Sequence, residues 1–154
     1  MTGSGDKAFV AGADITEFHG PDEARSIGGL FLDAFNAVAA LPRPTIASIS
    51  GFALGGGCEL ALACDFLVAS EHARFADTHA RIGIMPGWGL TVLLPQAVGT
   101  RRARQMSLTG NFVDAALALD WGLVNEVVPH EDLLPRCLSL ADDVAGNDQP
   151  GVRR

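Results

Sequence analysis

A glycine-rich segment that ends in an acid is the strongest chemical signal in this chain. Residues 51–60 read Gly-Phe-Ala-Leu-Gly-Gly-Gly-Cys-Glu-Leu, after a strand-like stretch. Glycines at the start of a helix leave backbone N–H groups open to a ligand at the positive end of the helix dipole, which suits a phosphate or a developing oxyanion. Glu59 follows Gly56 by one helical turn on the same face. The alternative interpretation is a plain strand–helix turn with a solvated acid.

A second segment, residues 8–15, reads Ala-Phe-Val-Ala-Gly-Ala-Asp-Ile and predicts a short strand that ends in a turn. Taken alone, it is equally compatible with Asp14 acting as a helix cap. Other chemical patterns are absent from the sequence. There is no phosphate-loop Gly-Lys-Ser/Thr, no dinucleotide glycine pattern, no Gly-x-Ser-x-Gly and no spaced His/Cys set, so we expect no metal site. Cys58 and Cys64 are expected to be packing residues.

Strands and helices alternate around these segments, which indicates an α/β fold. Pro21 opens a helix whose apolar residues recur at helical spacing up to Leu41, so one of its faces is expected to be buried. Thr100 and Asp114 are expected to cap two further helices, which Gly110 and Gly122 would end. The remaining elements are strands at 8–10, 45–50, 66–69 and 123–128, and helices through 59–64 and 133–144.

The composition fits one packed domain with 48% hydrophobic and 19% charged residues. A formal net charge of −7 with a single lysine sets nucleic acid aside as a partner. Three cysteines are too few for a disulfide framework, so we expect a cytoplasmic location. The uncharged stretch between Arg81 and Arg101 contains prolines and glycines, and we therefore expect buried or loop-forming chain there rather than a membrane helix.

Seven segments along the chain match a known family pattern in the same order. They are residues 8–15, 42–47, 55–61, 64–65, 73–75, 83–87 and 118–124. Through these segments, nearly the whole chain resembles the enoyl-CoA hydratase/isomerase (crotonase) superfamily.

The resemblance implies a crotonase-like (ClpP/crotonase) spiral of ββα units. Relative to the family, strands at the start and trimerisation helices at the end are missing, so residues 1–154 would form a partial domain. We therefore expect exposed apolar surface and marginal stability. The family's assembly is a homotrimer or hexamer, its substrate is an acyl-CoA thioester, and it needs no cofactor because coenzyme A is part of the substrate.

The resemblance also assigns the site. Ala13 and Gly56 would supply the two amides that hold the thioester oxygen, and Glu59 would act on water. The family's second glutamate falls at His79, a residue type that transfers protons near neutral pH. Possible substrate-binding positions are Ala11, Asp14, Ile15, Gly55 and Trp88.

Some alternatives stay open at this stage. His79 could be a satisfied polar residue near a turn, Asp77 is the less favoured substitute for the missing glutamate, and Trp88 could be plain core. Arg101, Arg102 and Arg104 could attract CoA phosphates or a partner subunit, or form a solvated face.

The resemblance favours an enzyme that adds water to a 2-enoyl-CoA to give a 3-hydroxyacyl-CoA, in fatty acid metabolism. The alternatives are an enoyl-CoA delta-isomerase, which needs one base only, and a non-catalytic acyl-CoA-binding or truncated remnant.

Overall fold

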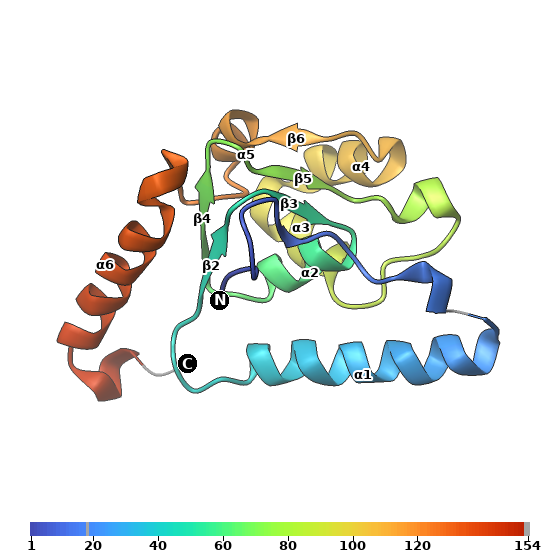
Figure 1. Cartoon of the computed structure of the whole chain (residues 1–154), viewed down its shortest axis with the longest axis horizontal. Helices are drawn as coiled ribbons and strands as arrows, with labels where there is room; N and C mark the ends of the chain where they lie inside the picture. Colours follow the sequence, from blue (N-terminus) through green and yellow to red (C-terminus); the bar gives the residue numbers. More distant parts are fainter. Residues whose placement is uncertain (18, 153–154) are drawn as a thin grey trace.

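Short strands and helices alternate along the chain, and the strands form two small sheets (Figure 1). The computed structural model describes residues 1–17 and 19–152. The strands are β1 (Ala8–Val10), β2 (Ile46–Ile49), β3 (Phe52–Leu54), β4 (Phe66–Ser70), β5 (Arg74–Ala76), β6 (Val113–Asp114) and β7 (Glu126–Val128). The α-helices are α1 (Pro21–Ala39), α2 (Gly56–Leu62), α3 (Leu90–Val98), α4 (Thr100–Thr109), α5 (Ala115–Trp121) and α6 (Leu133–Gly146). Short 3-10 helices are η1 (Ile15–Glu17), η2 (His79–Ile82), η3 (His130–Asp132) and η4 (Gln149–Val152).

From β1 to β5, consecutive strands of the chain belong alternately to one sheet and to the other. One sheet has the order β2-β4-β7 and is parallel throughout. The other has the order β1-β3-β5-β6, in which only β6 runs antiparallel to its neighbour. The pair β2 and β3, followed by α2, therefore places one strand in each sheet, and β4 and β5 repeat this before the next helices. This is the expected pattern of ββα units, and it confirms the α/β fold class.

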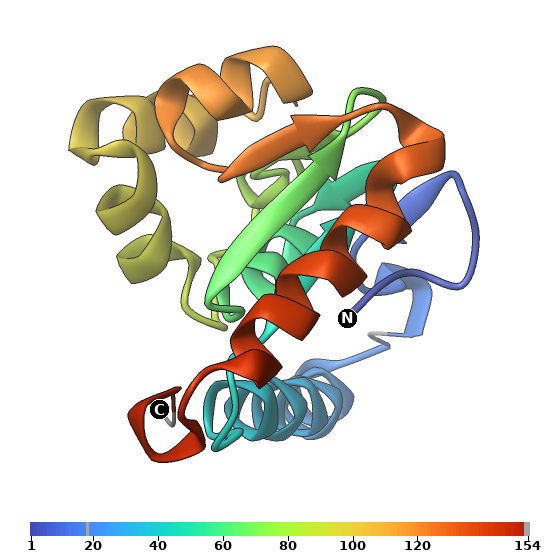
Figure 2. The ribbon, with the colours of Figure 1, turned by 90° about the vertical axis from the view of Figure 1, so that its left-hand side faces the viewer.

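The main core lies between the sheets and the helices that follow them. Its largest fully buried apolar side chains come from β2, β5, α3 and α4: Phe75, Ile49, Leu90, Leu94 and Met106. Burying each such side chain contributes about 1.5–3 kcal/mol. A smaller cluster forms where α6 lies along β2 and β4 (Figure 2), through Val68, Leu133 and Cys137.

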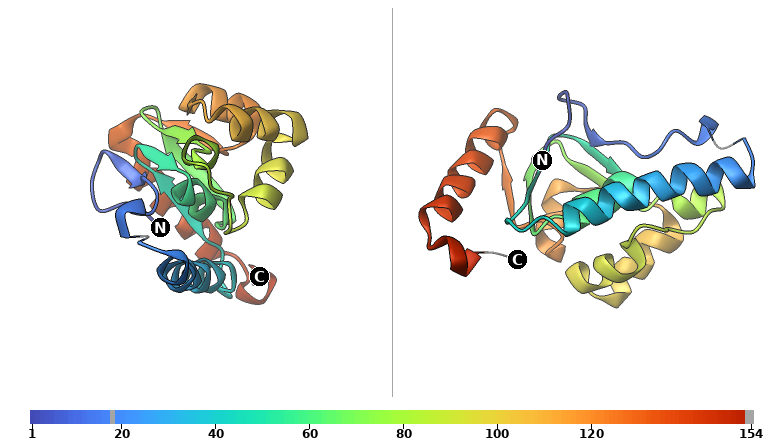
Figure 3. Two further views of the ribbon diagram at one scale, coloured as in Figure 1. Left: turned by 90° about the vertical axis from the view of Figure 1, so that its right-hand side faces the viewer. Right: turned by 90° about the horizontal axis from the view of Figure 1, so that it is seen from below.

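Helix α1 departs from the sequence prediction. Of its apolar residues, Phe35 is buried, but Leu30 is 69% exposed and Leu41, just after the helix, is 43% exposed. The helix runs along one side of the molecule (Figures 1 and 3), and its other apolar residues Ile27, Phe31 and Val38 are half-buried. The prediction of a buried face is therefore confirmed only in part, because Leu30 and Leu41 are exposed, whereas the expectation of exposed apolar surface is confirmed.

The four residues predicted to begin or end α4 and α5 meet different outcomes. Asp114 caps α5 by accepting a hydrogen bond from the Leu117 amide, and Gly110 and Gly122 end their helices in the left-handed conformation, as expected. Thr100 does not cap α4, because it is the first helical residue and Gly99 occupies the cap position without a side-chain bond.

The expected strand at 123–128 begins only at Glu126. The amides of Leu123 and Val124 instead donate back to the carbonyl of Ala118, in the middle of α5. The uncharged stretch after Arg81 forms a loop and then helix α3, which buries Leu90, Leu94 and Val98. No helix in the described part of the chain is long and apolar enough to cross a membrane.

Candidate active site

Sheet topology brings three separate segments to one edge. Strands β1, β3 and β5 are parallel neighbours, so the turns that follow their carboxyl ends meet there. The turn after β1 carries Ala13, the turn after β3 leads to Gly56, and the turn after β5 leads to His79. Residues more than sixty positions apart in sequence are thus placed around one space. The parallel pairing of these strands is what assembles the site.

That space is a cavity of about 340 Å³. Its lining residues are Ala11, Gly12, Ala13, Ile15, Gly28, Gly55, Gly56, Thr78, His79, Ile82, Ile84, Met85, Gly87 and Trp88. The list includes every residue predicted for the site except Glu59 and Asp14.

Asp14 does not line the cavity. Its Oδ1 accepts hydrogen bonds from the Thr16 amide at 2.9 Å and the Thr16 hydroxyl at 2.6 Å. These two bonds, the one to the side chain first, lower the pKa of the Asp14 carboxyl. The residue therefore caps the short helix η1, which is the structural alternative considered for it.

The glycines beside the cavity have steric reasons to be glycine. Gly55 has φ +52° and ψ −118°, a conformation that disfavours other residues. A Cβ atom on Gly56 would lie 2.7 Å from Cζ3 of Trp88, closer than packed atoms approach. Gly56 is also the first residue of α2, so its amide has no acceptor one turn earlier in the helix. An amide donor next to the cavity is the result.

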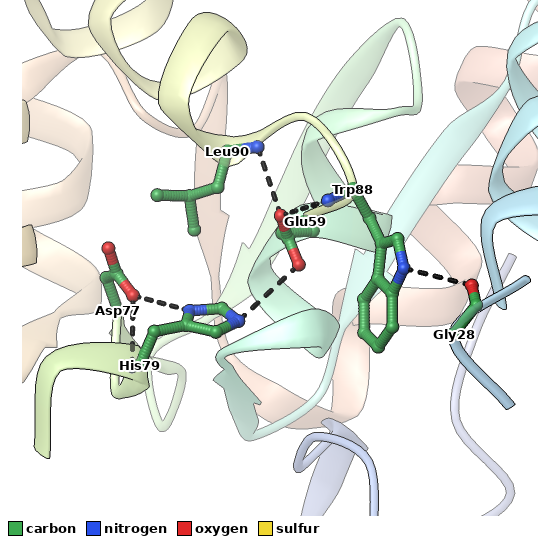
Figure 4. A network of polar contacts seen from close by, with 6 residues as sticks. All are labelled: Gly28, Glu59, Asp77, His79, Trp88 and Leu90. Atoms are coloured by element: carbon green, nitrogen blue, oxygen red, sulfur yellow. Dashed lines mark hydrogen bonds and ion pairs between the residues drawn. The ribbon is translucent and has the colours of Figure 1, made fainter. Parts of the chain in front are cut away.

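Glu59 is fully buried on α2 and held by main-chain donors (Figure 4). Its Oε1 accepts the amide hydrogens of Trp88 at 2.9 Å and Leu90 at 3.2 Å. Among the described residues, its Oε2 has no hydrogen-bond partner. The carboxylate is thus fixed through one oxygen, while the other remains available as an acceptor. The predicted solvated-acid alternative for Glu59 is wrong, because no part of the residue is exposed.

The available oxygen of Glu59 faces the ring of His79. His79 Nε2 lies 3.7 Å from Glu59 Oε2, an ion-pair distance too long for a direct hydrogen bond. On its other side, His79 Nδ1 lies 2.7 Å from Asp77 Oδ1, and the same oxygen accepts the His79 amide at 3.2 Å. The three side chains are buried and form one row, Asp77, His79 and Glu59 (Figure 4).

Burial and pairing shift the pKa values of this row in different directions. Burial raises the pKa of Glu59, and the amides of Trp88 and Leu90 offset this only in part. The hydrogen bond to Asp77 raises the pKa of His79 against the effect of its own burial. Burial would raise the pKa of Asp77, but hydrogen bonds from His79 and the Ser107 side chain outweigh it and lower that pKa. The row therefore favours a charged His79 next to an ionised Asp77.

Trp88 links the site to α1. Its amide holds Glu59, and its indole Nε1 donates to the Gly28 carbonyl of α1 at 3.3 Å. Phe31 and Phe35 of the same helix pack on the indole, with ring centroids 4.9 and 5.4 Å away. Trp88 is thus both a cavity-lining residue and the main apolar anchor of α1, so neither interpretation of it from the sequence was complete.

Other candidates lie away from the cavity lining. Burial first, and then the charges of Asp77 and Glu59, raise the pKa of the Cys58 thiol to about 12, as suits a packing residue. Arg102 contacts Asp120 and the Trp121 ring instead of the cavity. Within the described residues, no group of three or more His, Cys, Asp or Glu side chains is arranged to hold a metal ion.

Two features of the site were not predicted from the sequence. One is the pair of amides that hold Glu59, and the other is the bond between Asp77 and His79. An Asp-x-His spacing is a possible signal for the second, because Asp side chains commonly accept the amide two residues later. Nothing local signals the first, since Trp88 and Leu90 lie 29 and 31 residues beyond Glu59.

The fold and the site together define a crotonase-type α/β protein in which the turns that carry Ala13 and Gly56 line one cavity near a buried carboxylate. The sequence profile of the enoyl-CoA hydratase/isomerase family matches residues 1–152, and the chain belongs to that family. It is 44% identical over 99% of its length to the crotonyl-CoA hydratase of Syntrophomonas wolfei, of which it covers 60%.

Solved structures agree with this assignment. Over 98% of this chain and 59% of the other, the enoyl-CoA hydratase of Bacillus anthracis superposes with a TM-score of 0.94 at 40% identity. The enoyl-CoA hydratase of Mycobacterium avium is 57% identical over 73% of this chain and 50% of its own, with a TM-score of 0.72. The chain thus spans about 60% of the length of the first curated relative that it matches, and it contains only part of the full crotonase fold.

Proposed function

We propose that this chain binds an acyl-CoA thioester and adds water to a 2-enoyl-CoA, giving the 3-hydroxyacyl-CoA. The observation that carries the proposal is the pairing of Glu59 and His79 beside a cavity that Ala13 and Gly56 also line. The names of similar proteins, among them crotonyl-CoA hydratase and short-chain-enoyl-CoA hydratase, support it.

The amides of Ala13 and Gly56 would hold the thioester oxygen. Withdrawing electrons through that carbonyl makes the β-carbon of the enoyl group electrophilic and stabilises the enolate that forms on attack. Losing one such donor typically costs about 3 kcal/mol in the transition state. Small residues at both positions keep side chains out of the space that the thioester needs.

Glu59 and His79 would divide the proton transfers. The oxygen of water bonds to the β-carbon while a water proton passes to Glu59 Oε2, the oxygen without a hydrogen-bond partner among the described residues. Charged His79 gives its Nε2 proton to the α-carbon. Glu59 then gives its proton to a water molecule and His79 Nε2 takes one up from water, which restores both groups, so the net change is the addition of one water.

The proposed reaction changes no net oxidation state, so it requires no redox cofactor, and coenzyme A enters as part of the substrate. A double-bond isomerase needs only one base, and the charged His79 next to Glu59 favours water addition over that alternative.

Within the described residues no disulfide joins the three buried cysteines, which supports a cytoplasmic location. Exposed apolar side chains such as Leu108, Met85 and Leu30 support assembly into the family's trimer or hexamer.

Hydration of crotonyl-CoA by the purified chain tests the proposal. The loss of the enoyl-thioester absorbance is followed beside Glu59→Gln, with Glu71→Gln as a control that makes the same change at an exposed position. The proposal expects turnover in the wild type and the control, and a rate about 10²- to 10⁴-fold lower in Glu59→Gln. Equal rates in all three would remove Glu59 as the base. Turnover of a 3-enoyl-CoA without incorporation of labelled water would instead indicate the isomerase.

A further inference from the structure

We propose that Asp77 is a positioning residue that holds the His79 ring with Nδ1 protonated, so that Nε2 is the atom that exchanges protons in the site. This inference deepens the proposed function and rests on it for its catalytic part. Its structural part, the state of the His79 ring, can be measured without any turnover.

The geometry fixes the ring at two points. A single oxygen, Asp77 Oδ1, lies 2.7 Å from His79 Nδ1 and accepts the His79 backbone amide at 3.2 Å. A carboxylate can only accept hydrogen bonds, so the hydrogen between the two side chains lies on Nδ1. The bond from the backbone amide fixes the position of the His79 main chain, and the bond from Nδ1 fixes the orientation of its ring. Nε2 is left pointing to Glu59, and His79 also lines the cavity.

Asp77 is itself held in place. It is buried, and the Ser107 side chain on α4 contributes a further hydrogen bond to it. A buried carboxylate stays ionised only when it is well paired, and the pairing here outweighs burial, so the pKa of Asp77 is lowered. Asp77 therefore presents a fixed negative charge to the far side of the His79 ring.

The charged groups around His79 are two carboxylates. Within the described part of the chain, the charged groups that shift its pKa are Asp77 and Glu59, both of which raise it. Cys58 from α2 is a neutral thiol with a pKa of about 12. Arg81, on the same short helix, extends instead to Asn111 and the Phe112 ring. A carboxylate on each side thus keeps the imidazole protonated and aims its one mobile proton at the site.

In this arrangement Asp77 orients the ring and His79 transfers the proton, whereas a second glutamate would need no separate residue to orient it. A glutamate at position 79 would carry its own proton on either oxygen, whereas an imidazole must be held in one tautomer to act at a chosen atom. In this chain, Asp77 and His79 together would perform the task of the family's second glutamate.

The test combines NMR of the His79 ring nitrogens with the pH dependence of crotonyl-CoA hydration, for the wild type and Asp77→Asn. Asparagine keeps the shape but loses the charge. The proposal expects the pKa of His79 to fall in D77N, and the alkaline limb of kcat to move to lower pH with it. At about pH 7 kcat falls at least about tenfold, with a smaller change in KM.

The control is Asp65→Asn. Asp65 also accepts one backbone and one side-chain hydrogen bond, both from Thr45, at 2.7 and 2.9 Å. The proposal expects no change in the His79 titration in D65N. A second control uses His79→Glu as the background, in which D77N should no longer lower kcat, because no ring remains to be held.

Three outcomes would overturn the inference. The first is a His79 titration and tautomer that are unchanged in D77N. The second is a uniform loss of rate in D77N at every pH, which indicates a structural role only. The third is an equal loss of rate in the H79E background. If D77N does not fold, Ser107→Ala removes one bond to Asp77 and should shift the His79 titration in the same direction, and no shift would also overturn it. If the wild type does not hydrate crotonyl-CoA, the proposed function fails. The NMR result then still decides whether Asp77 determines the tautomer and charge of the His79 ring.

Discussion

His79 Nε2 lies 3.7 Å from Glu59 Oε2, and both side chains are buried. The two groups are too far apart to satisfy each other with a direct hydrogen bond, yet close enough to interact strongly as charges. Each is held from behind, Glu59 by the amides of Trp88 and Leu90 and His79 by Asp77. This arrangement leaves Glu59 Oε2 and His79 Nε2 facing each other, with His79 at the cavity lining, as the proposed base and acid require.

The stability of the chain should depend on the charge of His79. Because the folded pKa of His79 is raised above 6.5, its contribution to stability is fully present below 6.5 and is lost as pH rises through the folded pKa. Denaturant unfolding should therefore show a lower free energy of unfolding at about pH 9 than at about pH 6. His79→Gln should flatten that difference. An equal slope in both proteins would contradict the assigned charge.

Gly56 should tolerate no side chain while Trp88 is present. A Cβ atom at position 56 would meet Cζ3 of Trp88 at 2.7 Å, so Gly56→Ala must displace the indole or the proposed oxyanion-binding amide. We expect hydration to fall about 100-fold in Gly56→Ala, the size of losing one oxyanion donor. Measured in a Trp88→Ala background, the same change should cost much less. Additive losses in the double variant would show that the contact is irrelevant.

Two substitutions in α1 should differ sharply in their effect on stability. Phe35 is buried against Trp88, so Phe35→Ala should lower the free energy of unfolding by about 3 kcal/mol. Leu30 is 69% exposed, and Leu30→Ala should change it by less than about 0.5 kcal/mol. Chemical denaturation of both variants checks this. A large loss in Leu30→Ala would mean that something covers this face in solution.

The fold class was predictable from the sequence because the alternation of strands and helices is a local signal. The site residues Ala13, Gly56, Glu59 and His79 were predicted instead from the crotonase resemblance, which rests on the order of several segments. Ala13 and Gly56 line one cavity because their turns follow parallel neighbouring strands. The sequence predicts those strands only in part, since it did not indicate β3 as a strand of its own.

The hydrogen bonds within the site and the packing of α1 depend on contacts between distant residues, which local sequence patterns do not encode. The hydrogen bonds of Glu59 reach amides 29 and 31 residues away, where a loop enters α3. The Asp77–His79 bond requires the chain to turn from β5 into a 3-10 helix between the two residues. The spacing of apolar residues in α1 shows which face of the helix is apolar, but not which element packs on that face. The exposure of Leu30 could therefore not be predicted from the sequence.

The pH dependence of kcat/KM for crotonyl-CoA hydration, measured for the wild type and His79→Gln, tests the central claim most directly. The proposed mechanism requires ionised Glu59 and charged His79, and both pKa values are raised, from 4.5 and 6.5. The wild type should therefore show a bell whose acid limb lies above 4.5 and whose alkaline limb lies above 6.5. His79→Gln should be about 10²- to 10⁴-fold slower and should lack that alkaline limb. A variant that keeps the wild-type rate and the same alkaline limb would contradict the division of acid and base between these two residues.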